Sequence, residues 1–99
     1  MSFAGLPPLS ASISPTVLLF VADGCPACDA AKPEFERFKT KNPTILALML
    51  DAFGPYPDHF GVKIKLTPTY VLKLGDQGIV HPGAMNATAL EKWIKAYTK

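Results

Sequence analysis

The chain has 99 residues, of which 48% are hydrophobic and 18% are charged, and its net charge is +2. This length and apolar content predict a single domain with one core. Positive and negative side chains are interspersed, which excludes the clustered positive charge of a nucleic-acid-binding protein. No apolar run approaches the roughly 20 residues of a membrane span. We therefore expect a monomer without nucleic-acid or membrane partners.

The first 15 residues are rich in proline, serine and glycine. Pro7, Pro8 and Pro15 exclude a long helix here. A basic region followed by an apolar stretch, the pattern of a signal peptide, is not present. We expect an irregular arm at residues 1–15, with a short edge strand near residues 11–14, and one domain at residues 16–99.

A strand is predicted at residues 16–22, which are apolar without alternation and thus typical of a strand covered on both faces. After Asp23 and Gly24, a helix is predicted at residues 26–40. Pro26 suits its first position, where the missing N–H costs little, and Pro33 is expected to kink it. Its predicted buried stripe consists of Cys28, Ala31, Phe35 and Phe38.

The two cysteines of the chain, Cys25 and Cys28, are separated by two residues at the start of this helix. Unpaired N–H groups and the helix dipole favour an anion there. Such a position lowers a cysteine pKa from about 8.5 toward roughly 3.5–7.5. We therefore assign Cys25 as the nucleophile and Cys28 as the resolving cysteine. The carboxylate of Asp23 opposes a very low pKa, because a nearby negative charge disfavours the thiolate.

Two other interpretations of the cysteine pair are weaker. Structural zinc needs four ligands, and His59 and His81, the only histidines, lack ligand spacing. A structural disulfide that closes so short a loop restrains the unfolded chain little. We expect neither a metal nor a cofactor. Because no cysteine lies outside the pair, a reducing compartment and a cytoplasmic location are expected.

The second half of the chain predicts three strands and a helix. A strand at residues 44–51 should run parallel to the first, with a right-handed crossover. Residues 52–66 show no clear pattern beyond a helical turn at 58–61. Strands at 69–74 and 79–81 should form a hairpin around the turn at 75–78. Asn86 is expected to cap the last helix, whose predicted apolar stripe consists of Ala87, Leu90, Ile94 and Tyr97.

This order of elements, with C-x-x-C at the first helix start, resembles the thioredoxin family from residue 16 to residue 98. The matching motifs are Cys25-Pro26-Ala27-Cys28, Pro33, Asp51, Thr67-Pro68-Thr69, Gly75-Asp76-Gln77-Gly78 and Gly83-Ala84-Met85. The resemblance implies an α/β protein with a minimal thioredoxin fold, a four-stranded mixed sheet in the order 2-1-3-4 flanked by helices. Both long helices should cover one face, and the 52–66 segment and the arm the other.

The same resemblance implies a thiol–disulfide oxidoreductase that reduces protein disulfides, with a flavin-dependent reductase or glutathione as electron donor. The implied catalytic residues are Cys25, Cys28 and Asp29. The implied substrate-binding residues are Gly24, Pro26, Ala27, Thr67, Pro68 and Gly83, with Pro68 in the cis form facing the disulfide.

The sequence also departs from thioredoxins. Asp23 and Gly24 precede the motif, where thioredoxins usually carry a Trp. Leu19 stands where they bury a proton-accepting aspartate, so Asp29 is either its replacement or a surface charge. A proline at the first middle position of the motif resembles glutaredoxins, although their Gly-Gly-x-x-Asp signature is missing. A glutathione-dependent glutaredoxin and a non-catalytic thioredoxin-like binding module remain as alternatives.

Overall fold

The computed structural model describes residues 15–98. The arm predicted at residues 1–15, with its edge strand, lies outside the described residues except for Pro15, so the division at residue 16 stays a prediction. The elements are β1 (Thr16–Val21), α2 (Pro26–Lys41), β2 (Leu46–Asp51), α3 (Tyr56–His59), β3 (Thr69–Leu74), β4 (Gln77–Pro82) and α4 (Ala87–Thr98). No helix within residues 15–98 is long and apolar enough to cross a membrane.

The sheet has four strands in the order β2-β1-β3-β4, as predicted. β1 pairs in parallel with β2 and antiparallel with β3, and β3 pairs antiparallel with β4. The continuous apolar run of β1 fits its central place, because Val17 to Phe20 are fully buried. β2 is equally apolar but lies at the edge, and its Leu46 and Leu48 are exposed.

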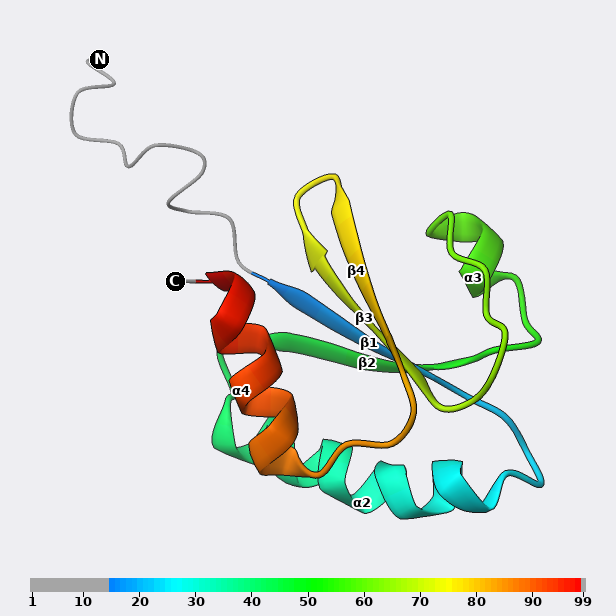
Figure 1. Cartoon of the computed structure of the whole chain (residues 1–99), viewed down its shortest axis with the longest axis horizontal. Coiled ribbons are helices and arrows are strands. Elements are labelled where there is room, and N and C mark those ends of the chain that lie inside the picture. The colour runs from blue at the N-terminus through cyan, green and yellow to red at the C-terminus, as the bar shows by residue number, and fades with distance from the viewer. Residues whose placement is uncertain (1–14, 99) are drawn as a thin grey trace.

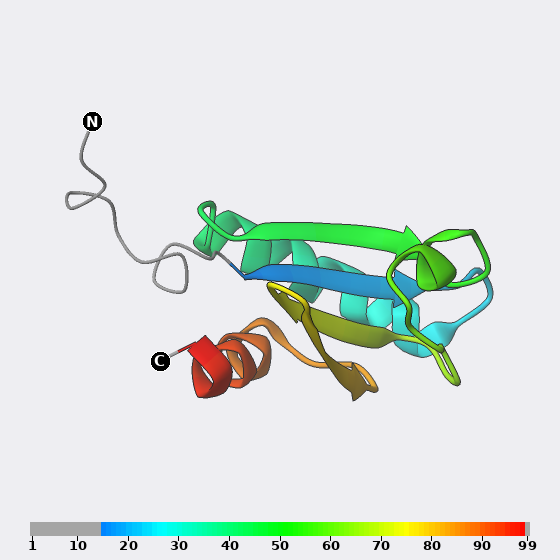
Figure 2. The same ribbon diagram turned by 90° about the horizontal axis from the view of Figure 1, so that it is seen from above.

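The two long helices, α2 and α4, cover one face of the sheet, whereas α3 and the segment after it lie over the other (Figures 1 and 2). This arrangement follows from two apolar clusters. The cluster on the helix face contains Val17, Leu19, Phe35, Phe38, Ala47, Tyr70, Leu72, Ala87, Leu90 and Ile94. The cluster on the α3 face contains Leu18, Phe20, Ala52 and Val71, with Leu50, Phe60, Val62 and Ile64 packed against it.

Helix α4 begins where two side chains supply acceptors. The Ala89 N–H donates to Oδ1 of Asn86 at 2.8 Å, which confirms the predicted cap. The Ala87 N–H donates to Oε1 of Glu34 at 3.0 Å, so a carboxylate on α2 also accepts a hydrogen bond from the start of α4. Glu34 thereby joins the two helices.

Tyr97 is the one wrong member of the predicted α4 stripe, because it is 51% exposed. Its ring packs edge-on against Trp93, with the centroids 6.5 Å apart. Trp93 in turn contacts the rings of Tyr70 and His81. The Trp93 indole is partly buried against the cluster on the helix face, whereas the Tyr97 ring lies outside it.

Several element boundaries also differ from the predictions by one or two residues. Leu74 pairs with Gln77, so the hairpin turn holds only Gly75 and Asp76, and β4 begins two residues earlier than expected. Gly75 has φ +61°, which a two-residue hairpin with glycine first requires. The helical turn α3 begins at Tyr56, because Pro57 fits a first helical turn, where its missing N–H costs little.

Candidate active site

The cysteine pair forms a disulfide at the start of α2, with the two Cα atoms 5.1 Å apart. Cys25 is the N-cap of the helix, in an extended conformation, and its Sγ accepts a hydrogen bond from the Cys28 N–H at 3.1 Å. Cys28 is fully buried beneath, whereas Cys25 is half-buried. An attacking cysteine must be accessible to a substrate, whereas a resolving cysteine need only reach its partner sulfur, so this difference in burial fits the predicted roles.

Two polar groups of Thr67 also lie near the Cys25 sulfur. Its hydroxyl donates to Sγ of Cys25 at 3.4 Å, and its carbonyl oxygen lies 3.5 Å from the same sulfur. The Thr67–Pro68 peptide bond is cis. Because a hydrogen bond to a charged group stabilises the charged form, the Thr67 hydroxyl and the Cys28 N–H both favour a thiolate on Cys25 once the disulfide is reduced.

A second loop is tied to this site through Gly83. The Gly83 N–H donates to the Pro68 carbonyl at 2.8 Å, and Gly83 has φ +95°, a conformation that favours glycine. The loop continues to Met85, whose N–H donates to the Tyr70 hydroxyl at 3.1 Å, while that hydroxyl donates to the Met85 carbonyl at 3.3 Å. The loop therefore stays close to Pro68.

Burial raises the pKa of Tyr70 above its ordinary value of 10.0. The Met85 hydrogen bond opposes this rise, and the Glu34 carboxylate adds to it. The neutral hydroxyl is therefore the form that holds the loop across the physiological range.

The other predicted site residues lie around the disulfide on the surface. Gly24, with φ +70°, makes the left-handed turn before Cys25, and the predicted binding residues Pro26 and Ala27 are exposed beside the sulfurs. The Asp29 side chain is 73% exposed and pairs with Lys32 at 3.7 Å. The Asp29 N–H donates to the Cys25 carbonyl at 3.0 Å within the helix. Within the described residues, no hydrogen bond joins the Asp29 carboxylate to either cysteine.

Leu19 is fully buried in the cluster on the helix face. The strand position that resembles the buried aspartate of thioredoxins therefore offers no proton acceptor. The rings of His59 and His81 pack edge-on against those of Phe60 and Trp93 respectively. Among residues 15–98, no three His, Cys, Asp or Glu side chains gather in a way that could hold a metal ion.

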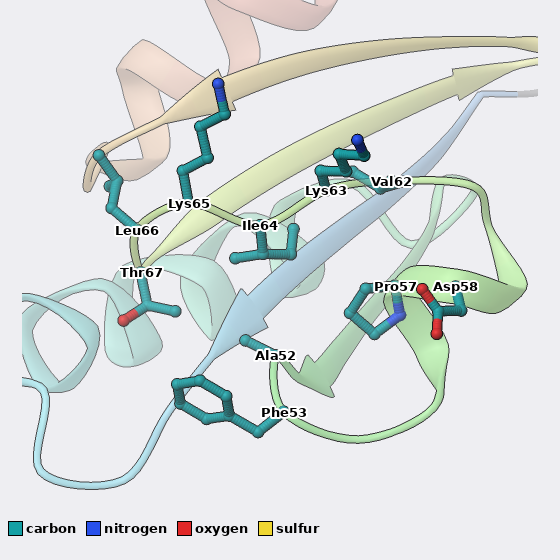
Figure 3. Close-up of a pocket in the computed structure, with 10 residues that line it drawn as sticks. All are labelled: Ala52, Phe53, Pro57, Asp58, Val62, Lys63, Ile64, Lys65, Leu66 and Thr67. Atoms are coloured by element: carbon teal, nitrogen blue, oxygen red, sulfur yellow. The ribbon is translucent and has the colours of Figure 1, made fainter.

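A pocket of about 510 Å³ begins at Thr67 and extends between α3 and the segment at residues 62–66 (Figure 3). No motif of the sequence predicts it. The available signal was the alternation of apolar residues with Lys63 and Lys65 across that segment, which indicates a chain packed on one side only. The lining residues are Ala52, Phe53, Pro57, Asp58, Val62, Lys63, Ile64, Lys65, Leu66 and Thr67.

A four-stranded sheet in this order, with a C-x-x-C disulfide at the start of the first long helix, defines a thioredoxin fold. Solved thioredoxin structures superimpose on the chain accordingly. Thioredoxin of Fasciola hepatica matches with a TM-score of 0.71 and 21% identity, over 88% of this chain and 84% of that one. Oxidized mitochondrial thioredoxin 3 of Saccharomyces cerevisiae matches with a TM-score of 0.71 and 28% identity, over 89% and 83%.

The short form of thioredoxin f from spinach chloroplast gives a TM-score of 0.71 at 23% identity, over 88% of this chain and 79% of that one. No protein-family model matches the sequence, and no curated protein matches it. The thioredoxin fold and the disulfide-forming pair together support the class of thiol–disulfide oxidoreductases.

Proposed function

We propose that this protein reduces disulfides of other proteins by dithiol exchange through Cys25 and Cys28. One observation carries the proposal. The sulfur of half-buried Cys25 accepts hydrogen bonds from the Cys28 N–H and the Thr67 hydroxyl. Cys28, almost one helical turn further along α2, is fully buried. A substrate sulfur can reach Cys25 first, and Cys28 is in place for the second exchange.

The exchange takes two steps. In the reduced protein, the Cys25 thiolate attacks one substrate sulfur, so that a Cys25–substrate disulfide forms, the substrate disulfide breaks and the first substrate thiolate leaves. The Cys28 thiolate then attacks the Cys25 sulfur, which closes the Cys25–Cys28 disulfide and expels the second substrate thiolate. The substrate gains two electrons, which the protein dithiol loses, and both released thiolates take up protons.

Cys28 must lose its proton before the second step, and the buried Leu19 cannot accept it. Asp29, the residue after Cys28, is the carboxylate that we propose for this role. Because its side chain is largely exposed and makes no hydrogen bond to Cys28 among the described residues, the proton would pass through water.

Substrate contact is proposed for the surface around Cys25, formed by Gly24, Pro26 and Ala27 on one side and by Thr67, Pro68 and Gly83 on the other. Free space in front of Gly83, where a Cβ would meet nothing within 4 Å, leaves room for a substrate chain. We further propose that the protein works as a monomer in the cytoplasm. A flavin-dependent reductase or glutathione would return it to the dithiol form.

An insulin-reduction assay tests the proposal. With dithiothreitol as the electron source, we expect the protein to speed precipitation of the insulin B chain. Cys25→Ser should abolish the effect. Cys28→Ser, first reduced and then freed of dithiothreitol, should accumulate a mixed disulfide with the substrate, because no second thiol is present to resolve it. A rate equal to that of dithiothreitol alone would instead identify a non-catalytic binding module. Replacing dithiothreitol by glutathione, or by a thioredoxin reductase with NADPH, then separates a glutaredoxin from a thioredoxin.

A further inference from the structure

The pocket beside Thr67 is continuous with the candidate active site. Thr67 lines the pocket, and its hydroxyl donates to the Cys25 sulfur at 3.4 Å. The volume of about 510 Å³ falls within the roughly 300–1,000 Å³ of ligand pockets. Figure 3 shows Ile64, Ala52 and Pro57 around the hollow, with Phe53 and Leu66 toward the Thr67 end. A chain held at Cys25 can therefore extend directly into this space.

Two large apolar side chains at that end of the pocket are exposed without an evident structural role. Phe53 is 85% exposed and Leu66 is 49% exposed. Neither belongs to the two apolar clusters that hold the sheet. Exposed apolar residues at the rim of a hollow are typical of an interaction site, and they favour a bulky apolar side chain as the occupant.

The segment that forms one wall of the pocket has free backbone donors. Within the described residues, the N–H groups of residues 63 to 66 make no hydrogen bond. Unpaired backbone groups along a chain accept pairing with an extended peptide, which is how many domains bind polypeptide segments. The occupant that fits such a wall is a stretch of polypeptide.

The same segment carries two positive charges. The apolar Val62 and Ile64 turn toward the sheet, whereas Lys63 and Lys65 are exposed on the other side of the segment. Neither lysine forms an ion pair with any residue between 15 and 98. The lining residues include one carboxylate, Asp58, on α3. The outer side of this segment, along which an extended peptide would run, is therefore positively charged, which complements acidic side chains.

We propose that this pocket is the docking groove for protein substrates, and that it selects extended segments that carry a bulky apolar residue and acidic residues near their disulfide. The apolar side chain enters between Phe53 and Leu66, and the acidic side chains pair with Lys63 and Lys65. This substrate preference rests on the proposed disulfide reductase function, because the groove places the substrate cystine at Cys25.

Binding of fluorescein-labelled, cysteine-free peptides, measured by anisotropy, tests the groove without any turnover. The peptides are an acidic peptide with a central Phe, the same peptide with Lys in place of its acidic residues, and the acidic peptide with Ala in place of Phe. We expect the acidic Phe peptide to bind at least tenfold more tightly than the other two at low ionic strength. The charge preference should weaken with added salt, because salt screens exposed charges.

Three variants test whether the peptides bind in this pocket. The double variant K63E/K65E should lose the preference for the acidic peptide, whereas K92E/K95E, the same charge change on exposed positions of α4, should keep it. Phe53→Ser should reduce the advantage of the Phe peptide over the Ala peptide severalfold. All three replace exposed side chains, so the fold is retained. Absence of measurable binding, or equal effects of the two double variants, would overturn the proposal.

Turnover separates this proposal from the proposed function. Reduction of 2,2′-dithiodipyridine, a small uncharged disulfide that cannot fill the groove, should proceed at the wild-type rate in K63E/K65E. Reduction of the acidic Phe peptide carrying a disulfide should slow at least fivefold. If both disulfides are reduced equally well by the wild type and by K63E/K65E, the groove proposal falls and the reductase stands. If the wild type reduces neither, the reductase proposal falls, and the anisotropy still decides the groove.

Discussion

At the residue scale, the reactivity of Cys25 is expected to depend on Thr67, which lies 42 positions further along the chain. Thr67→Val keeps the shape of the side chain but removes the hydroxyl that donates to the sulfur. Because the charged form loses a donor, the thiolate should form at higher pH, and alkylation at mildly acidic pH should slow severalfold. The measurement is the rate of iodoacetamide labelling of the reduced protein against pH.

Thr40→Val, on the exposed surface of α2, is the matched control and should leave the labelling profile unchanged. A Thr67→Val profile that superimposes on that of the wild type would show that the hydroxyl does not stabilise the thiolate.

The second prediction at this scale concerns Asp29. Asp29→Asn should slow the resolution of the mixed disulfide severalfold while leaving the first attack by Cys25 nearly unchanged, because only the second step requires Cys28 to lose its proton. Single-turnover kinetics with acid quench separates the two steps. Resolution at the wild-type rate would identify Asp29 as a surface charge, in keeping with its pairing with Lys32, and the proton would then leave to solvent.

At the scale of elements, the two parallel strands β1 and β2 look alike in sequence but differ in position. Leu19 on central β1 is fully buried, whereas Leu46 on edge strand β2 is 57% exposed. Leu19→Asp should lower the free energy of unfolding by about 3 kcal/mol, because a carboxyl group enters an apolar core without a partner. Leu46→Asp should change it by less than about 0.5 kcal/mol. Urea denaturation of the oxidised protein measures both, and equal losses would contradict the assigned places.

At the scale of the whole molecule, Tyr70 connects β3 with the loop that reaches Gly83. Its pKa is raised in the folded state, so from about pH 10 the unfolded chain releases the phenolic proton before the folded one does. The stability associated with the neutral hydroxyl is present below that pH and is lost as pH rises toward the raised pKa. Urea denaturation between pH 8 and pH 11 should show a steeper decline for the wild type than for Tyr70→Phe. Parallel declines would show that Tyr70 titrates alike in both states.

Local signals in the sequence were enough to predict most helices and strands and to place the cysteine pair at the centre of the candidate site. The continuous apolar run of β1 predicted a central strand, since such a run is typical of a strand covered on both faces. The proline after Cys25 and the C-x-x-C spacing placed the cysteines at a helix start, because both depend on residues within one turn. The roles of the two cysteines were inferred from this helix start, whereas the strand order came from the resemblance of these motifs to thioredoxins.

Contacts between distant parts of the chain were decided only by the tertiary structure. The Thr67 hydroxyl reaches Cys25 because β3 lies next to β1, and Glu34 meets Ala87 because α2 and α4 share a face. The exposure of Leu46 follows from its place on an edge strand, which its apolar sequence does not reveal. The segment at residues 62–66 is too short and irregular for its sequence to predict a structure. They form a wall of a pocket only because the sheet behind them supplies the apolar surface on which Val62 and Ile64 pack.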